Sequence, residues 1–292
     1  GATASARGAE AHRATIPAEQ LLADPRRAAE TDRAAAELQT RALIDEAFTE
    51  QFRTTFSRLD DKEASRVLSR FNINMTRARA ELDAAMQEQK GKEGILLPEA
   101  LNLIRRYQFH SAHEAMQPLY EQLAAEDDAR RYIVDREILI RTPQGAQIAA
   151  LAFCPKMTGD SLPTLLGFHI YANDDNSVIE ARKTAAYGYC GAVAYSRGKG
   201  RSPGAPTPYE YDGDDARAVI DWISRQSWSD GRVGMYGGSY AGFTQWAAAK
   251  RLPEALRAIM PSVTAVPGIV VPMQRNVFFN FVYPWVPYVT NI

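Results

Sequence analysis

The sequence predicts an α/β protein in which a mostly parallel sheet with crossover helices follows an all-helical N-terminal region. Apolar residues recur every three or four positions within residues 21–128, whereas short apolar strands alternate with helical segments from residue 129 onward. A third observation is a glycine-rich turn around Ser239, which separates a short strand from a helix. We therefore expect a disordered or tag-derived tail over residues 1–20, a helical region over 21–128 and an α/β core over 129–292.

Composition excludes few classes of protein. The 292 residues allow one large domain or two smaller ones, and 34 basic against 35 acidic residues give no global charge that favours nucleic acid. No apolar run is long enough to predict a membrane span. The chain starts Gly-Ala-Thr-Ala-Ser-Ala, which is typical of a tag remnant or of a mature end after signal removal. The compartment stays open, with a bacterial periplasmic or secreted location favoured over a cytoplasmic one.

The N-terminal region shows periodic apolar stripes, which predict antiparallel packed helices. The first stripe repeats every four residues and consists of Ile44, Phe48, Phe52 and Phe56. The second has spacings of three and four and consists of Leu68, Phe71, Met75, Ala78, Leu82 and Met86. We expect a third helix to begin at Pro98 and a fourth, short helix to begin at Pro118.

A pair of histidines in this region could suggest a metal site. His110 and His113 are three residues apart, with Glu114 beside them, so a helix could present both imidazoles to zinc. The order H-x-x-H-E differs from the known zinc motifs, however, and no third ligand is evident. We therefore predict no metal.

Strand patterns begin near Arg130. Tyr132–Ile140 and Gln147–Phe153 flank the turn Thr142–Gly145, which predicts a hairpin. The segments that follow alternate between strand and helix, as expected for a parallel sheet. They are an apolar strand at 163–171, a helix at 178–187, a strand at 191–195 and a helix at 212–226.

The two cysteines are too few to predict a disulfide framework. Cys154 and Cys190 lie in or beside apolar strand-like runs. We therefore expect buried free thiols rather than a bridge, and cysteine usage does not decide the compartment.

The turn at Ser239 has the layout of a nucleophile elbow. Val233–Tyr236 is a β-prone run, and good helix formers follow from Tyr240. Strand and helix pass closely in such a turn, so its neighbours must be small, as Gly237 and Gly242 are. The usual G-x-S-x-G pattern is altered, because Ala241 takes the last glycine position. The alternative is a strand-to-helix loop that merely favours glycine.

Several further blocks follow one another within residues 130–262: Arg141–Gly145, Phe168–Tyr171, Arg197–Gly204, Asp212–Asp215, Asp221–Ile223, Trp228–Gly231, Gly237–Gly242, Gln245 and Trp246. In content and order they together resemble the cocaine esterase / Xaa-Pro dipeptidyl-peptidase family of α/β-hydrolases. One departure is Tyr195, where the family often has an acid.

The resemblance implies an α/β-hydrolase core and a serine hydrolase that needs no cofactor and no metal. Ser239 would be the nucleophile, and the backbone N–H of Tyr240 and the hydroxyl of Tyr171 would stabilise the oxyanion. The alternative for Tyr171 is a core tyrosine at a strand end. The Arg197–Gly204 loop lacks the spacing of a phosphate-binding loop, so we interpret it as packing around the elbow.

The histidine and the acid of a catalytic triad normally follow the serine in this fold. After Ser239 the sequence contains no histidine and no aspartate, and its last acid is Glu254. Either the chain is the N-terminal portion of a longer enzyme with a core incomplete at its C-terminal end, which we favour, or the protein is an inactive or unusual hydrolase. His169 could share a strand face with Tyr171 and act as the base, although a hydrogen-bonded core histidine is the simpler interpretation.

The C-terminal segment Phe278–Tyr288 is rich in aromatic residues. Phe278, Phe281 and Trp285 either bind substrate or pack against a missing part of the same protein. The expected function is cleavage of a small ester, amide or short peptide, without nucleic-acid or membrane partners and with a possible homo-oligomer. The alternative is a catalytically inactive binding protein with a hydrolase fold that uses its helical region to recognise partners.

Overall fold

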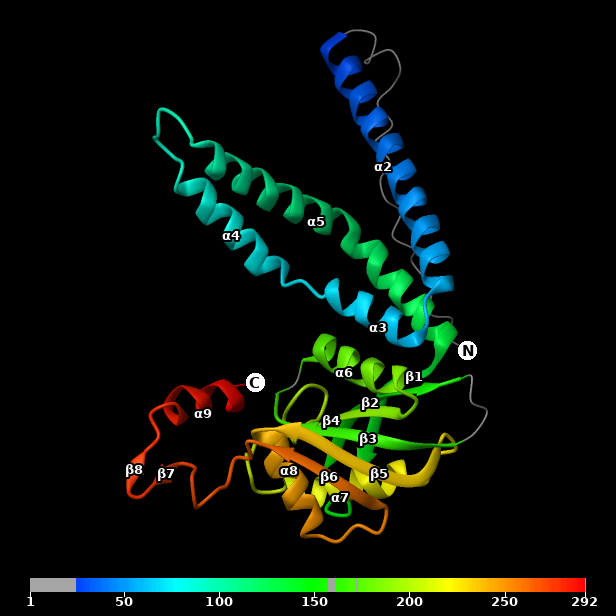
Figure 1. The fold of residues 1–292 in the computed structure, drawn as a ribbon, viewed down its shortest axis with the longest axis vertical. Coiled ribbons are helices and arrows are strands. Elements are labelled where there is room, and N and C mark those ends of the chain that lie inside the picture. Colours follow the sequence, from blue (N-terminus) through cyan, green and yellow to red (C-terminus); the bar gives the residue numbers. More distant parts are fainter. Residues whose placement is uncertain (1–24, 157–160, 172, 292) are drawn as a thin grey trace, which may run out of the picture. The chain divides into compact units, whose positions relative to one another are not determined.

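The computed structural model describes residues 25–156, 161–171 and 173–291 (Figure 1), so the predicted tail over residues 1–20 lies outside them. The chain divides into two compact units, Gly1–Phe52 and Arg53–Ile292. Helix α2, Pro25–Arg58, begins in the first unit, where the rings of Phe48 and Phe52 lie 6.2 Å apart. The domain limits expected from the sequence stay a prediction.

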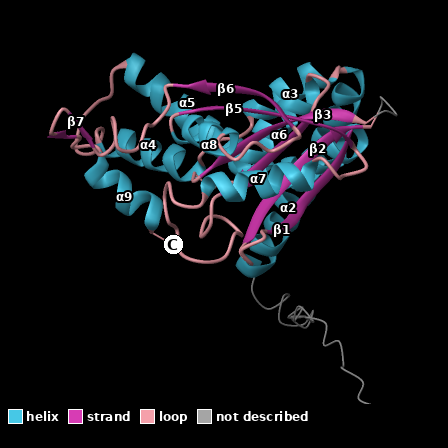
Figure 2. Ribbon diagram, turned by 90° about the horizontal axis from the view of Figure 1, so that it is seen from below, coloured by secondary structure: helices cyan, strands magenta, loops and turns pink. Residues whose placement is uncertain are grey.

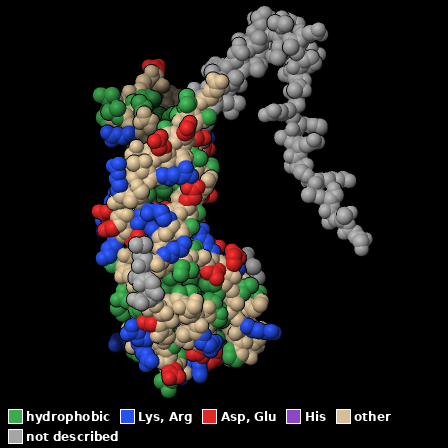
Figure 3. All heavy atoms as spheres, turned by 90° about the vertical axis from the view of Figure 1, so that its right-hand side faces the viewer, with side chains coloured by type: hydrophobic (Ala, Val, Ile, Leu, Met, Phe, Trp, Pro, Cys, Tyr) green, Lys and Arg blue, Asp and Glu red, His purple; other side chains and the backbone are tan. Residues whose placement is uncertain are grey.

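In the second unit, the end of α2 is followed by three helices before the sheet: α3 (Asp61–Arg70), α4 (Met75–Gln87) and α5 (Leu97–Arg131). The second apolar stripe is divided between α3 and α4, because Asn74 caps α4 by accepting a hydrogen bond from the Arg77 backbone N–H. Helix α3 begins with a capping box between Asp60 and Glu63. Figure 3 shows one face of the molecule, on which acidic and basic side chains are interspersed.

The predicted separation of a helix at Pro98 from another at Pro118 is wrong. Helix α5 continues through Pro118, although proline removes one helical hydrogen bond. Tertiary contacts just beyond it favour the continuous helix: Tyr120 stacks on Phe71 with ring centroids 4.9 Å apart and donates a hydrogen bond to the Leu68 carbonyl over 3.0 Å. Packing therefore outweighs the local preference of proline.

The sheet has six strands in the order β1-β2-β4-β3-β5-β6. Figure 2 shows them in magenta, flanked by helices. β1 pairs with β2 and β2 with β4 in antiparallel fashion, whereas the pairs β3–β4, β3–β5 and β5–β6 are parallel. The strands are β1 (Tyr132–Arg141), β2 (Gln147–Pro155), β3 (Leu162–His169), β4 (Cys190–Tyr195), β5 (Ser229–Gly238) and β6 (Leu256–Ser262).

Helices cover both faces of this sheet: α6 (Asp174–Ala186), α7 (Asp212–Ile223) and α8 (Tyr240–Ala249) (Figure 1). Strand β2 is buried on both sides, as expected for a central strand. Its residue Ile148 packs in a core with residues of α7, and its residue Phe153 packs in a second core with residues of α6. The mostly parallel α/β core and the helical region before it are therefore confirmed.

The expectation of free thiols is wrong, because Cys154 and Cys190 form a disulfide, with Cα atoms 4.3 Å apart. β2 and β4 are antiparallel neighbours, and their register pairs Phe153 with Gly191. In this antiparallel register the adjacent residue pair is Cys154 and Cys190, so strand pairing brings the two cysteines together. The spacing of 36 residues in sequence gave no sign of this pairing.

Ion pairs fasten the end of α5 to α6 and to α3. Arg182 of α6 donates two hydrogen bonds to the Asp128 carboxylate, over 2.6 and 2.7 Å, and both side chains are buried. Arg131 donates to Asp127 over 2.8 Å and to Asp61 over 2.7 Å. These contacts fix the point at which the helical region enters β1.

The C-terminal segment contains two short strands, β7 (Met273–Gln274) and β8 (Val277–Phe278), and helix α9 (Val282–Thr290). The two strands pair with each other in antiparallel fashion and form a sheet separate from the main one. Within the described residues, no helix combines the length and the apolar character that a membrane crossing requires.

Candidate active site

Ser239 lies in the turn between β5 and α8, as the sequence predicts. Its φ of 55° and ψ of −116° place a non-glycine residue in the left-handed half of backbone space. Such a conformation costs of the order of 1–3 kcal/mol and persists only where the surroundings impose it. The residue is exposed, so the hydroxyl of this strained turn is accessible from solvent.

Close packing surrounds the turn at Ser239. Gly237 has a φ of 130°, and a Cβ atom there would lie 2.6 Å from the Cβ of Ala241. A Cβ atom on Gly242 would lie 2.7 Å from Thr264 Oγ1 and 3.1 Å from the Ser262 carbonyl oxygen. Helix α8 thus passes so close to the strand ends that only glycine fits at these positions.

Backbone hydrogen bonds hold the turn from both sides. The N–H of Ser239 donates to the Ser262 carbonyl at the end of β6 over 2.9 Å. The Ser239 carbonyl accepts from the N–H groups of Gly242, Phe243 and Ala265, each over 3.1 Å. These hydrogen bonds hold the turn at the carboxyl ends of β5 and β6.

Tyr240 is the first residue of α8, where a backbone N–H has no intrahelical acceptor and the helix dipole favours negative charge. Its side chain is buried. The hydroxyl donates to Asp212 Oδ2 over 2.7 Å and accepts from the Tyr209 N–H over 2.9 Å. Burial and the neighbouring Asp212 carboxylate raise the pKa of Tyr240, so the hydroxyl stays protonated.

Asp212, the first residue of α7, was not singled out as a site residue from the sequence. Its buried carboxylate accepts hydrogen bonds from Ser196 Oγ over 2.6 Å, from Tyr240 and from the Tyr209 N–H over 3.0 Å. Burial raises its pKa, against the opposing effect of these three hydrogen bonds. Its position in the block Asp212–Asp215 was the available signal, but a sequence block does not show which side chains an acid meets.

The Arg197–Gly204 loop is bonded to the protein itself. Arg197 forms two hydrogen bonds of 2.7 Å with the carboxylate of Asp215. Ser202 Oγ accepts from the Ala149 N–H over 2.7 Å and donates to the Tyr195 carbonyl over 2.9 Å. These contacts agree with the interpretation of the loop as packing.

Tyr171 lies two residues beyond the end of β3 and is half-buried. Its ring centroid is 6.3 Å from that of Tyr240, and its hydroxyl accepts a hydrogen bond from Trp285 Nε1 over 3.0 Å. The structure thus brings together Tyr171, Tyr240 and Trp285, whose positions in the sequence are far apart. Around them lies one apolar cluster, which also contains Ile170, Tyr209, Phe243 and Val289.

The other two aromatic candidates have different neighbours. Phe278 and Phe281 are exposed. The ring of Phe278 lies 5.0 Å from that of Tyr283, and the ring of Phe281 lies 6.0 Å from that of Phe279. Neither residue belongs to the apolar cluster around Trp285. Their role in substrate binding stays a prediction.

Each of the three histidines in the described residues lies near an oxygen atom of another residue. His110 Nδ1 lies 3.6 Å from Glu114 Oε2, and His113 Nδ1 lies 2.8 Å from the Phe109 carbonyl oxygen, so each has a partner in its own helix. His169 Nε2 lies 3.8 Å from Glu180 Oε2 on α6. Among the residues that the structure describes, no three His, Cys, Asp or Glu side chains are placed to hold a metal ion.

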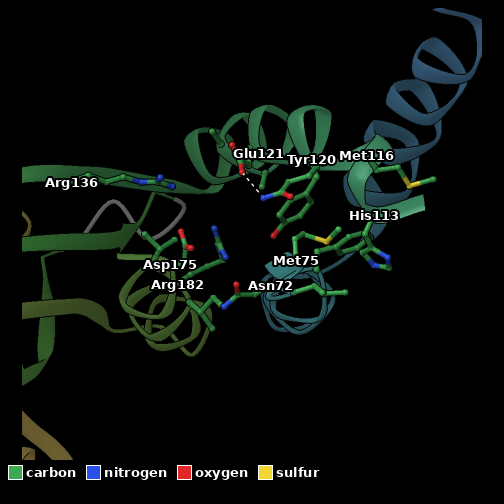
Figure 4. Close-up of a pocket in the computed structure, with 16 residues that line it drawn as sticks. Asn72, Met75, His113, Met116, Tyr120, Glu121, Arg136, Asp175 and Arg182 are labelled. Carbon is green, nitrogen blue, oxygen red and sulfur yellow. Dashed lines mark hydrogen bonds between the residues drawn. The ribbon is translucent and has the colours of Figure 1, made fainter. Parts of the chain in front are cut away.

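A cavity of about 320 Å³ lies elsewhere, where α5 faces α6 (Figure 4). Figure 4 shows Arg182 and Asp175 of α6 opposite Tyr120 of α5. No residue of the Ser239 turn lines it, and Arg182 is already bonded to Asp128. The cavity walls contain both arginines and carboxylates, so their charge favours no particular ligand.

The strand–turn–helix layout, the sheet order and the helices on both faces define an α/β-hydrolase fold. Residues 144–286 match the model of the family described as X-Pro dipeptidyl-peptidase (S15 family). Cocaine esterase from Rhodococcus sp. (strain MB1 Bresler) is 32% identical over 139 residues, which are 46% of this chain and 24% of that protein. The predicted family resemblance is confirmed, and the chain spans about a quarter of the length of this relative.

Several solved structures are similar to part of this chain. An α-amino acid ester hydrolase is 24% identical, with 54% of this chain and 30% of that chain covered and a TM-score of 0.46. An aminopeptidase from the marine sediment archaeon Thaumarchaeota archaeon is 23% identical, with 49% and 27% covered and a TM-score of 0.42. A CocE/NonD family hydrolase from Staphylococcus aureus is 23% identical, with 44% and 27% covered and a TM-score of 0.39.

Proposed function

We propose that the protein is a serine hydrolase that cleaves an ester or amide bond through an acyl-Ser239 intermediate. The observation that supports this most is the exposed Ser239 at positive φ between β5 and α8, within the segment 144–286 that matches the hydrolase family. A strained turn is costly to keep unless its geometry is used.

In this mechanism Ser239 Oγ attacks the carbonyl carbon of the substrate while a general base takes its proton. The negative oxygen of the tetrahedral intermediate accepts hydrogen bonds from the Tyr240 N–H and the Tyr171 hydroxyl. The intermediate then expels an alcohol or an amine, which receives the proton. Water attacks the acyl-enzyme in the same way and releases the acid and free Ser239.

The general base in this proposal is a histidine, oriented by an acid, that lies outside the sequence described here. No histidine and no aspartate follow Ser239, whereas in this fold both normally do. His169 is a poor alternative, because its Nδ1 atom is buried without a hydrogen-bond partner and its Nε2 atom faces Glu180 of α6 at 3.8 Å, so neither nitrogen is bonded to Ser239. The substrate is a small ester, an amide or a short peptide, which covers the activities named for the S15 family and for cocaine esterase.

The second candidate is a catalytically inactive binding protein that retains the hydrolase fold. The serine hydrolase should turn over a substrate, whereas the inactive binding protein should not. We expect the full-length natural protein to hydrolyse p-nitrophenyl esters or Xaa-Pro anilides, and we expect Ser239→Ala to lower kcat by at least about 10³-fold, because the nucleophile is lost. Ser69→Ala, which removes an exposed hydroxyl on α3, is the matched control. A Ser239→Ala protein with normal turnover would refute the serine mechanism, and an inactive natural protein would favour the binding role.

A further inference from the structure

Trp285 forms a hydrogen bond with the side chain of Tyr171. The indole Nε1 lies 3.0 Å from the Tyr171 hydroxyl oxygen, across 114 residues of sequence. An indole N–H can only donate, so the direction of this hydrogen bond is unambiguous. The Tyr171 oxygen is therefore the acceptor, and its own proton remains for another acceptor.

Ring contacts fix the indole in place. Trp285 stacks on Tyr209 with centroids 5.8 Å apart and lies 6.1 Å from the ring of Tyr240. Val289, one helical turn further along α9, is buried in the same cluster. The donor is thus held by the same tyrosine whose backbone N–H begins α8.

A tyrosine hydroxyl has one proton and two acceptor lone pairs. When one lone pair is occupied by a fixed donor, the remaining directions for the proton are restricted. A hydrogen bond accepted by an oxygen also polarises its O–H group and strengthens the bond that it donates. Both effects make Tyr171 a better donor to a developing negative charge.

We propose that Trp285 is a positioning residue, which orients and polarises the Tyr171 hydroxyl through its indole N–H so that Tyr171 can stabilise the oxyanion. The inference rests on the proposed serine hydrolase function and deepens it. Helix α9 would then contribute to catalysis through Trp285. Trp285 itself would act on Tyr171 and would not touch the substrate. Packing of Trp285 alone, without this hydrogen bond, would give a different result in the test below.

The test is a double-mutant cycle in the full-length natural protein. Trp285→Phe keeps an aromatic ring and removes the donor. We expect it to lower kcat about tenfold with KM nearly unchanged, as the loss of one hydrogen bond of about 1.4 kcal/mol implies. In a Tyr171→Phe background the same substitution should have no further effect. Trp246→Phe, at an exposed tryptophan of α8, is the matched control and should leave kcat unchanged.

Equal losses from Trp285→Phe in both backgrounds, or no loss in either, would overturn the inference. Trp285→Leu also lacks a hydrogen-bond donor and replaces Trp285→Phe if that variant does not fold. A protein without any Ser239-dependent turnover would instead refute the proposed function. In that case the ¹⁵N-indole NMR signal of Trp285 decides the contact: it should shift in Tyr171→Phe, and an unchanged signal would refute the contact itself.

Discussion

The hydroxyl of Tyr240 donates a hydrogen bond of 2.7 Å to Asp212 Oδ2, and so joins the first residue of α8 to the first residue of α7. Ser196 Oγ donates to the other carboxylate oxygen, Oδ1, over 2.6 Å. The residue whose backbone N–H is the proposed oxyanion donor is thus anchored by its own side chain. A buried acid that no catalytic step uses therefore supports the geometry of the site.

This acid predicts a pH dependence of stability. Burial raises the pKa of Asp212 above its ordinary value of about 3.9, so the folded protein binds the proton more tightly than the unfolded chain does. Its contribution to the free energy of unfolding is fully present below pH 4 and is lost as the pH rises through the raised pKa. Asp212→Asn should remove this part of the slope.

Urea unfolding of both proteins at a series of pH values from 4 to 7 measures the effect. Burial also raises the pKa of Asp215, so part of the slope should remain in the variant. Identical slopes in the natural protein and in Asp212→Asn would show that Asp212 does not titrate in this way.

The close approach of α8 to the strand ends makes a second prediction. Gly242→Ala places a Cβ atom 2.7 Å from Thr264 Oγ1 and 3.1 Å from a backbone carbonyl, which must shift to accommodate it. We expect a loss of about 1–3 kcal/mol in the free energy of unfolding, as for other overpacked sites, together with lower turnover. Gly94→Ala is the control, because a Cβ atom there has no neighbour within 4 Å. Equal stability of the two variants in urea would contradict the close packing.

The ion pair between α5 and α6 makes a third prediction. Arg182→Met leaves Asp128 buried without its bidentate partner, and only the 3.4 Å contact with Arg136 remains. Breaking a buried pair in this way costs about 3–5 kcal/mol. The matched control is Arg79→Met, which breaks the exposed pair with Asp83 and should cost less than about 1 kcal/mol. Chemical denaturation compares the two, and a small loss in Arg182→Met would mean that the pair does not hold α5.

Local patterns in the sequence predicted the elements and the turn at Ser239, because a glycine requirement and a change of period are visible within a few residues. Nonlocal pairings could not be predicted in this way. The Cys154–Cys190 disulfide depends on which strand lies beside β2, and the path of α5 through Pro118 depends on tertiary packing. The hydrogen bond between Tyr171 and Trp285 joins a loop to a helix that is 114 residues away in sequence, and a local sequence pattern cannot indicate such a contact.

The most direct test of the central claim is covalent labelling of the full-length natural protein with a fluorophosphonate, followed by peptide mapping. Such a probe reacts with an activated serine and leaves ordinary hydroxyl groups unmodified. We expect the adduct on the peptide that contains Ser239, and no labelling of Ser239→Ala. An unlabelled natural protein, or an adduct on another serine, would contradict the assignment of Ser239 as the nucleophile.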